Sequence, residues 1–488
     1  MRLQSTTAGI IVIGDEILKG HTADSNSHFL CQRLRQLGIS VQKITILPDQ
    51  VDCIAEEVRN FSTKFDHVIT SGGIGPTHDD KTFEGVAKAF DVKLSLNPEL
   101  SSVVRQYFGE HHEPSSPVYK LATIPETADL LWGKDLRTGR TSFYPVVRIR
   151  NVTVFPGVPK LLQRAFSMLE NHFVSGGKFH SCKLYLSSDE VSVADILTEV
   201  QNNHSDVSLG SYPDFSHSYY KVKLILDSED ADALSKAYSD LKQRLPADKI
   251  VGFDEHPLEN CSEKLDNYLE TCPDFEFVAR VRESLKIVEE ALTLYRLDDL
   301  CLSFNGGKDC TVLLHLIYVV MQKKFGPSNG MKIPALYIRK KAAFTELEEF
   351  LSDCLQRYNM DIIRINDEIK SGLAQLQTQH PEIKAIFMGT RNSDLKKKLA
   401  FWARTDPGWP EYMRISPILM WSYHDVWKFL RDLYLPYCQL YDQGYTSMGE
   451  PGETSKNPAL LYTDPFGLKH YRPAYWLRDA STERNGRR

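Results

Sequence analysis

The sequence lacks the cysteine pattern of secreted, disulfide-rich proteins. No two of its nine cysteines form a C-x-x-C pair, and they are scattered over positions 31, 53, 182, 261, 272, 301, 310, 354 and 438. A secreted disulfide framework is instead an even set at close spacings. The pattern therefore indicates reduced thiols, and we expect a cytoplasmic protein.

Long apolar runs and an excess of basic residues are absent as well. The purely apolar stretches fall far short of the roughly 20 residues that a membrane span needs. The opening stretch, MRLQSTTAGIIVIGDEI, leaves no room for a secretory signal. A net charge of −6 gives no basic field that would attract nucleic acid. We expect neither a membrane nor a nucleic-acid partner, and the sequence leaves the oligomeric state open.

A chain of 488 residues is too long for one core, and its patterning predicts several domains. Strand-like runs such as AGIIVIG, VQKITIL, DHVITSGG and VVRIRNVTVF alternate with helical stretches over residues 6–170, which predicts a doubly wound α/β domain. Residues 171–248 predict a small α+β subdomain, and residues 249–273 suit a linker. Residues 274–488 predict a second doubly wound α/β domain, with helices at 276–296, 308–323, 345–358 and 366–378 and strands at 299–304, 334–338, 361–365 and 384–388.

The most informative short stretch is SFNGGKD, residues 303–309, which joins a predicted strand to a predicted helix. A helix start offers unpaired N–H groups and the positive end of its dipole, and glycines let an anion approach the backbone closely. Asp309 stands where a Walker A loop has Ser or Thr, so this is a different kind of loop. We expect it to bind phosphate, and a plain tight turn is the alternative.

A second strand-to-helix join lies in the N-terminal part, at SGGIGPTHDD, residues 71–80. Its glycines could cradle an anion, and its carboxylates could hold a divalent metal or cap a helix. A further acidic pair ends the first predicted strand at the same sheet edge. The candidate anion or metal site consists of Gly14, Asp15, Glu16, Gly72, Gly73, Gly75, Thr77, Asp79 and Asp80.

These N-terminal motifs, GDEILKG and GGIGPTHDD together with PGVP at 156–159, closely resemble the molybdopterin-binding domain family over residues 6–170. That family includes molybdopterin-handling enzymes and relatives that hydrolyse nucleotide pyrophosphates with a divalent metal. The resemblance implies the fold more firmly than the activity. It leaves open a metal-dependent FAD or nucleotide pyrophosphatase, a regulatory module or molybdopterin adenylylation.

The C-terminal motifs resemble the phosphoadenosine-phosphosulfate reductase superfamily and, within it, the FAD synthase family of animals. They are SFNGGKD, MGTRNSD at 388–394, TDPGWPEYMRISPILMWSYHDVWKFL at 405–430 and LPYCQLYDQGYTSMGE at 435–450. The resemblance implies transfer of AMP from ATP to FMN, giving FAD and pyrophosphate, with Mg²⁺ accompanying ATP. It also suggests delivery of FAD to apo-flavoproteins. A reductase needs a cysteine in its C-terminal tail, whereas this chain has none after Cys438.

The resemblance assigns roles to individual residues of the second α/β domain. Lys308, Asp309, Arg391 and Asp394 would be catalytic, with Asp309 as a magnesium ligand or loop organiser. Trp409 and Arg414, with Asp406, would bind the flavin. ATP would lie on Ser303, Phe304, Asn305, Gly306, Gly307, Lys308 and Asp309. Because all these groups follow the expected linker, we expect synthesis to reside wholly in residues 274–488.

Two basic stretches depart from the pattern of that family. Leu395 and Lys396–Lys398 stand where a proline and small or apolar residues are usual, and Arg339–Lys341 replace small, hydroxyl or acidic residues. Lysine runs are ordinarily solvated faces, but these are expected to border the nucleotide. A non-catalytic scaffold that binds flavin or nucleotide is therefore a further alternative. Apart from the short polar tail STERNGRR, at 481–488, the sequence has no low-complexity tract, and it has no convincing internal repeat.

Overall fold

The computed structural model describes residues 6–109, 116–135, 138–326, 330–339, 343–394 and 399–487. By its internal contacts the chain divides into two compact units. The first comprises residues 1–183, 194–210 and 225–245, and the second comprises residues 184–193, 211–224 and 246–488. None of the helices within the described ranges combines the length and apolar character needed to cross a bilayer.

The first unit is built on a six-stranded sheet of order β2-β1-β3-β8-β7-β6. β2, β1, β3 and β8 run parallel, and β7 and β6 are antiparallel to their neighbours. The strands are β1 (Thr6–Ile13), β2 (Ile39–Leu47), β3 (His67–Ser71), β6 (Asp129–Leu131), β7 (Val146–Ile149) and β8 (Val152–Phe155). A separate antiparallel pair consists of β4 (Leu94–Leu96) and β5 (Thr123–Pro125).

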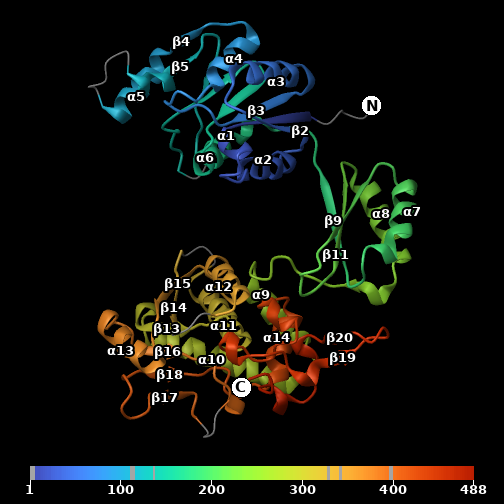
Figure 1. The fold of residues 1–488 in the computed structure, drawn as a ribbon, viewed down its shortest axis with the longest axis vertical. Coiled ribbons are helices and arrows are strands. Elements are labelled where there is room, and N and C mark those ends of the chain that lie inside the picture. The colour runs from blue at the N-terminus through green and yellow to red at the C-terminus, as the bar shows by residue number, and fades with distance from the viewer. Residues whose placement is uncertain are drawn as a thin grey trace. The chain divides into compact units, whose positions relative to one another are not determined.

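Helices cover both faces of this sheet (Figure 1), as the alternating pattern predicts. Successive residues of a strand point to opposite faces, so Ile11 and Ile13 of β1 pack with α3 and α4, while Ile10 and Val12 pack with α2 and α6. The helices are α1 (Asp15–Leu18), α2 (Ser25–Gln36), α3 (Val51–Lys64), α4 (Thr82–Phe90), α5 (Pro98–Phe108) and α6 (Pro159–Leu169).

The run VVRIRNVTVF forms two strands, where its β-branched pattern suggested one. β7 and β8 pair as an antiparallel hairpin, and Arg150 in the turn has a left-handed φ of 53°. Asn151 anchors the turn, because its Nδ2 donates to the carbonyls of Ser62 at 3.0 Å and Phe65 at 2.8 Å. The Arg150–Asn151 pair was the local turn signal, since asparagine favours such positions.

The middle of the chain contributes a four-stranded sheet of order β10-β11-β9-β12, as expected for a small α+β element. The division between the two compact units passes through this region. Its elements are β9 (His180–Leu186), α7 (Ala194–Asn203), β10 (Ser208–Pro213), β11 (Val222–Ser228), α8 (Ala231–Arg244) and β12 (Ile250–Val251).

The second unit is built on a six-stranded sheet of order β15-β14-β13-β16-β18-β17, in which only β17 is antiparallel. The strands are β13 (Leu300–Ser303), β14 (Ile333–Ile338), β15 (Met360–Ile365), β16 (Ala385–Phe387), β17 (Trp402–Arg404) and β18 (Met413–Ile415). The helices are α9 (Cys261–Thr271), α10 (Phe275–Leu294), α11 (Lys308–Phe325), α12 (Thr345–Arg357), α13 (Ile369–Gln379) and α14 (Tyr423–Asp432). A hairpin, β19 (Leu461–Thr463) with β20 (Lys469–Tyr471), follows. The predicted α/β fold class is confirmed.

The strand order places a topological switch point between β13 and β16. From β13 the chain passes to β14 on one side, and β16 lies on the other. In doubly wound sheets, ligands bind beyond the carboxyl ends of the strands where the order reverses. The loops after β13 and β16 are therefore the positions in this unit best suited to a ligand.

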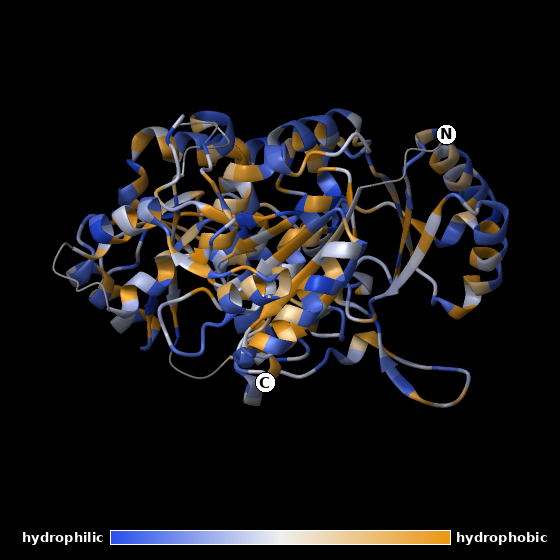
Figure 2. Ribbon diagram, turned by 90° about the horizontal axis from the view of Figure 1, so that it is seen from above, coloured by the Kyte–Doolittle hydropathy of each residue, from blue (hydrophilic) through white to orange (hydrophobic). Residues whose placement is uncertain are grey.

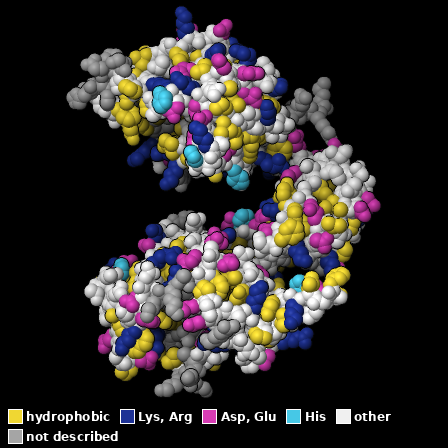
Figure 3. Space-filling model, viewed as in Figure 1, with side chains coloured by type: hydrophobic (Ala, Val, Ile, Leu, Met, Phe, Trp, Pro, Cys, Tyr) yellow, Lys and Arg dark blue, Asp and Glu magenta, His cyan; other side chains and the backbone are white. Residues whose placement is uncertain are grey.

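Helix α9 lies within residues 249–273, the stretch whose composition suits a linker. Its Cys261, Leu265 and Leu269 are buried in the same core as α10 and α11. The middle region adds Tyr219 and Tyr220 to this core. Figure 2 shows apolar residues along the central strands, and in the face seen in Figure 3 basic and acidic side chains are intermixed. The C-terminal core thus extends well before residue 274.

Candidate functional site

The SFNGGKD stretch forms the end of β13, a tight turn and the start of α11. Gly306 has a left-handed φ of 73°, which favours glycine. The backbone N–H of Gly307 donates to Oδ1 of Asn305 at 2.9 Å. Phe304 is fully buried, so its side chain serves the core. Lys308 is the first residue of α11, which places its charge at the positive end of the helix.

Lys308 and Asp309 form an ion pair at the start of α11. Nζ of Lys308 lies 3.1 Å from Oδ2 of Asp309, and Lys308 is only 2% exposed. Its ammonium lies over the rings of Tyr423 and Tyr441, at 5.3 and 5.8 Å from their centroids. The lysine is thus held in an enclosed aromatic setting, where charge interactions are stronger than in water.

Arg391 follows β16 and reaches the same place, as its position in MGTRNSD suggested. It is 1% exposed, and its Nε lies 2.7 Å from Oδ1 of Asp309. Its backbone N–H donates to Oδ2 of Asp394 at 3.1 Å. Burial opposes the charge of Arg391, but Asp309 and Glu483 outweigh it, and its pKa is raised. The guanidinium therefore stays charged.

Not every polar atom of this cluster is satisfied. Nε of Arg391 and Oδ1 of Asp309 approach each other without hydrogen-bonding geometry, and Nη1 of Arg391 has no hydrogen-bond partner in the part of the chain that the structure describes. Buried polar groups nearly always find a partner. An unmatched N–H on a buried cation therefore suits an anionic ligand.

The cluster contains one carboxylate that the sequence did not reveal. Glu483, from the polar tail, accepts from Nζ of Lys308 at 2.6 Å and from Nη2 of Arg391 at 2.8 Å on each oxygen. It is 8% exposed. A charged residue in a polar tail without apolar periodicity is ordinarily expected to be solvated, so the sequence offered no signal for this carboxylate.

The thiol beside the cluster lies in an environment that favours its protonated form. Cys310 follows Asp309 directly, and burial together with the Asp309 charge raises its pKa to about 12. A thiol with that pKa stays protonated at neutral pH, whereas nucleophilic cysteines need the thiolate. The site therefore works with carboxylates and cations.

The three flavin candidates lie together on or beside the β17–β18 hairpin. Nη1 of Arg414 is 3.4 Å from Oδ2 of Asp406, and its Nη2 donates to the carbonyl of Arg404 at 2.8 Å. Trp409 is 39% exposed, with Nζ of Lys370 5.8 Å from its ring centroid. The backbone N–H of Trp409 donates to the carbonyl of Asp406 at 3.1 Å. An exposed indole can stack on a planar ligand, and a fixed guanidinium can orient one.

In the N-terminal unit the glycine-rich loop approaches the first acidic pair through Asp49, which the sequence reasoning missed. The N–H of Asp15 donates to Oδ2 of Asp49 at 3.0 Å, and a Cβ on Gly73 would lie 3.1 Å from Oδ1 of Asp49. Burial raises the pKa of Asp49, while a hydrogen bond from Lys19 lowers that of Asp15. Across the described residues, no group of three or more His, Cys, Asp or Glu side chains is placed to hold a metal ion.

Asp80 organises the loop itself. Its Oδ2 accepts from the N–H of Thr77 at 3.0 Å and also from the Thr77 hydroxyl. Helix α4 begins at Thr82 without a side-chain cap, so Asp80 stabilises the turn and does not cap that helix. Asn26, another residue that sequence reasoning missed, donates to Oγ of Ser71 at 2.9 Å and to the carbonyl of Gly157 in PGVP at 2.7 Å.

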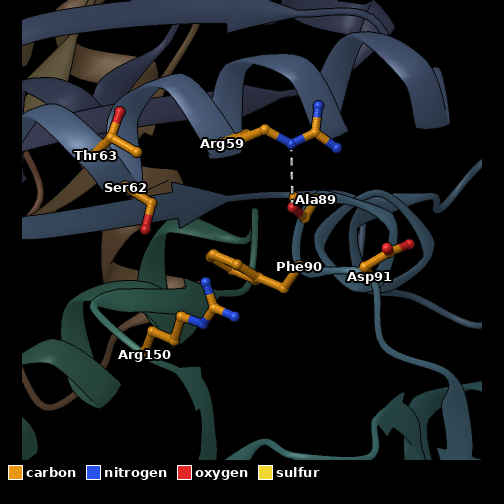
Figure 4. A pocket seen from close by; sticks show the side chains of 7 residues that line it. All are labelled: Arg59, Ser62, Thr63, Ala89, Phe90, Asp91 and Arg150. Atoms are coloured by element: carbon orange, nitrogen blue, oxygen red, sulfur yellow. Dashed lines mark hydrogen bonds between the residues drawn. The ribbon is translucent and has the colours of Figure 1, made fainter.

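Described residues of the N-terminal unit line cavities at two places. One of about 310 Å³ adjoins the glycine-rich loop and is lined by Gly73, Gly75, Asp80, Glu84, Lys120 and other residues. The other, of about 340 Å³, lies between α3 and the end of α4 (Figure 4). In the second, Arg59 donates to the carbonyl of Ala89 at 3.3 Å, and Arg150 lies over the Phe90 ring. Its arginines thus stabilise a helix end and a ring face.

Comparison with known proteins places the whole chain in one family. Family models match as a probable molybdopterin binding domain over residues 9–174, the middle domain of FAD synthase over 178–254, and a phosphoadenosine phosphosulfate reductase domain over 299–456. A probable FAD synthase of Caenorhabditis briggsae is 39% identical, covering 99% of this chain and 97% of the relative. The chain belongs to the FAD synthase family. A probable FAD synthase of Caenorhabditis elegans shows the same identity and coverage.

The family resemblance inferred from the motifs is therefore confirmed. Among solved structures, the chain is similar to the FMN adenylyltransferase of Candida glabrata in complex with FMN and the ATP analogue AMPCPP. That protein is 24% identical with a TM-score of 0.43, and the match covers 48% of this chain and 99% of that one.

The basic departures from the family pattern are only partly visible. Arg339 donates to the hydroxyl of Tyr337 at 3.1 Å and pairs with Glu348, so its charge is compensated locally. Lys340, Lys341 and Lys396–Lys398 lie outside the described residues.

Proposed function

We propose that this protein is an FAD synthase whose C-terminal unit transfers the AMP moiety of ATP to FMN and releases pyrophosphate. The observation that carries this is the convergence of Lys308 and Arg391 on one buried cluster. They follow β13 and β16, the two strands that flank the switch point of the sheet. That position is where doubly wound sheets bind ligands.

Adenylyl transfer needs no covalent enzyme intermediate. A phosphate oxygen of FMN attacks the α-phosphorus of ATP, the bond to the β-phosphate oxygen breaks, and the electron pair leaves with pyrophosphate. The protein must align two anions and stabilise the negative charge of the departing group. Lys308 and Arg391 would provide that stabilisation, and Nη1 of Arg391 is the N–H best suited to donate to a phosphate oxygen.

The loop of residues 303–309 would hold the ATP phosphates through its backbone. Mg²⁺ accompanies ATP and typically uses only one or two protein carboxylates besides phosphates and water. Oδ1 of Asp309 fits one such ligand, because it is buried and makes no hydrogen bond within the described residues, although it would have to share its charge with Nε of Arg391 at 2.7 Å. When bound, the ion would neutralise phosphate charge. Asp394, which is held by the backbone of Arg391, would support the same edge.

FMN would lie against the β17–β18 hairpin, with its ring on Trp409 and its orientation set by Arg414 and Asp406. The exposed indole and the neighbouring ion pair support this assignment. Delivery of FAD to apo-flavoproteins and a cytoplasmic location stay predictions from the sequence.

The test is direct. The full chain with FMN and Mg-ATP should lose flavin fluorescence as FAD forms, with equimolar pyrophosphate. Lys308→Ala and Asp309→Ala should each lower kcat by about 10²-fold or more, the effect of removing a charge-stabilising contact. Failure of the wild-type chain to make FAD would contradict the proposal, and near-normal kcat in both folded variants would contradict the phosphate role.

For the N-terminal unit we propose a metal-dependent pyrophosphatase acting on FAD or a related nucleotide. Because the described residues offer no group of three ligating side chains, the ion would be held by one or two carboxylates, such as Asp15 and Asp49, together with the phosphates of the substrate. The cavity of about 310 Å³ beside Gly73 and Gly75, with Lys120 and Asp80 in its wall, supports this. The full chain incubated with FAD and divalent metals, without ATP, should release FMN and AMP, and Asp15→Asn should reduce that release. If no metal supports release, a binding or regulatory module is the better description.

A further inference from the structure

We propose that Glu483 is a positioning residue for adenylyl transfer, which holds the side chains of Lys308 and Arg391 in their catalytic arrangement. This inference rests on the proposed function. Lys308 stands at the start of α11 and Arg391 follows β16, and neither element by itself fixes where the charged end of the side chain goes. Glu483 contacts both charged ends directly.

The carboxylate of Glu483 connects the two cations. Nζ of Lys308 lies 2.6 Å from Oε1 of Glu483, and Nη2 of Arg391 lies 2.8 Å from both Oε1 and Oε2. One carboxylate thus sets the separation of two cations from different loops. Charge-assisted hydrogen bonds of this length are short and roughly twice as strong as neutral ones.

The tail that carries Glu483 is itself fixed to the unit. The backbone carbonyl of Glu483 accepts from the Thr446 hydroxyl at 2.6 Å, and Nδ2 of Asn457 donates to that hydroxyl oxygen at 2.9 Å. Nδ2 of Asn457 also donates to the carbonyl of Thr482 at 2.8 Å. Thr446 and Asn457 are both buried. The carboxylate therefore sits on a supported backbone, as a positioning group requires.

The charges of the cluster give Glu483 a second function. Two mutually repelling cations, Lys308 and Arg391, share one enclosed site with Asp309, and Oδ1 of Asp394 lies 3.6 Å from Nη2 of Arg391. Buried charges need compensation. Glu483 adds to the compensation from Asp309 and Asp394 through hydrogen bonds to both cations, and it leaves Nη1 of Arg391 without a protein acceptor in the described residues. The arrangement thus keeps one N–H of the arginine available for the substrate.

A shift of about 1 Å in a catalytic group can lower the rate by about 10²-fold. We expect Glu483→Gln to lower kcat by about 10- to 100-fold, because the amide keeps the shape but donates as well as accepts and carries no charge. KM for FMN should change less than about threefold, since the flavin candidates lie on another hairpin. Thr446→Val, which loosens the carbonyl of Glu483 without changing a charge, should lower kcat several-fold.

The experiment measures kcat and KM for both substrates in wild type, Glu483→Gln, Thr446→Val and the control Glu289→Gln, which alters an exposed residue of α10. Unfolding curves establish whether each variant is folded. If Glu483→Gln does not fold, Thr446→Val alone tests the positioning role. Unchanged kcat in the folded variants overturns the positioning role. A lower KM for ATP with a higher kcat/KM in Glu483→Gln also overturns it, because Glu483 would then be a competitor of the substrate phosphate. A wild-type chain that makes no FAD would instead overturn the proposed function.

Discussion

The hydroxyl oxygen of Tyr441 accepts a hydrogen bond from the backbone N–H of Lys308 at 2.9 Å. Tyr441 belongs to the short 3-10 turn Gln439–Tyr441, which follows α14. The contact therefore connects the start of α11 to a segment that comes 133 residues later. The candidate phosphate loop is thus stabilised by a residue that belongs to neither β13 nor α11. We therefore expect catalysis by this loop to depend on residues distant in the sequence.

Arg391 should tolerate neither removal nor replacement by lysine. Arg391→Lys keeps the charge but loses the planar group that contacts Asp309 and Glu483 at once. We expect kcat to fall by about 10²-fold or more for Arg391→Lys and by about 10³-fold for Arg391→Ala, as for a transition-state arginine. Arg357→Lys, an exposed change on α12, is the matched control and should leave kcat within about twofold.

Lys397→Ala, in the basic run after Arg391, should also change kcat little, because lysine runs are ordinarily solvated. If Lys397→Ala lowered kcat more than Arg391→Ala, the wrong cation would have been assigned to the substrates.

Trp409 should affect FMN more than ATP. Trp409→Ala removes the exposed ring proposed to stack on the flavin, a contact of about 0.5–1.5 kcal/mol beyond area burial. KM for FMN should rise by about 3- to 10-fold, whereas KM for ATP should stay within about twofold. Trp476→Ala is the control, because Trp476 is 54% exposed on another part of the unit. Equal effects of the two variants on KM for FMN would remove Trp409 from the flavin site.

The middle region should stabilise the C-terminal unit. The hydroxyl of Tyr219 is 2.9 Å from the carbonyl of Leu430 and 2.6 Å from that of Leu435, and Arg431 lies 4.2 Å over its ring. Tyr219→Phe leaves the buried Leu435 carbonyl without its hydroxyl donor, whereas the Leu430 carbonyl keeps the N–H of Leu435 at 2.9 Å. The free energy of unfolding should therefore fall by about 1–3 kcal/mol. Urea denaturation followed by tryptophan fluorescence measures it, with the half-exposed Tyr212→Phe as control.

The same contacts bear on where synthesis resides. A fragment of residues 274–488 would lose Tyr219 and all of α9 from its core, so we expect it to unfold at lower urea than a fragment of residues 184–488. Measuring kcat of both fragments at saturating substrates, without urea, separates this loss of stability from any loss of catalytic rate. Equal midpoints for the two fragments would show that the preceding segments contribute no stability.

His315 should make the C-terminal unit sensitive to acid. It is buried on α11, its Nδ1 lies 3.3 Å from the Tyr358 hydroxyl, and burial lowers its pKa to about 3. The unfolded chain, with a pKa of about 6.5, gains a proton that the folded chain does not bind between these values. Stability is therefore fully present above pH 6.5 and is lost as the pH falls, by about 1.4 kcal/mol per unit.

His315→Gln cannot take up that proton. The variant is expected to be less stable than wild type at pH 7, because its amide replaces a well-packed ring, but the gap should narrow by about 2–3 kcal/mol at pH 4.5. Urea titrations across this range, read from tryptophan fluorescence, give both values. A gap that stays constant with pH would contradict the buried, neutral state of His315.

Much of the fold was predictable because its signals are local. The alternation of strand and helix in residues 299–388 depends on side-chain periodicity over a few turns, and each predicted element is present. The turn at Gly306 and the placement of Lys308 at a helix start follow from seven consecutive residues. The hairpin at Arg150 was not predicted, because two short strands of similar composition resemble a single strand when the turn between them has few residues and these are polar.

The sequence by itself determined that a lysine begins a helix after a glycine turn and that an arginine follows a second strand. Only the tertiary structure decided that both meet Glu483, 175 residues from Lys308, and that Tyr219 and α9 belong to the C-terminal core. The physical reason is the range of the forces involved. Periodicity and turn preferences act between near neighbours, whereas the pairing of buried charges and the burial of aromatic rings are settled by whichever distant segments the folded chain brings together.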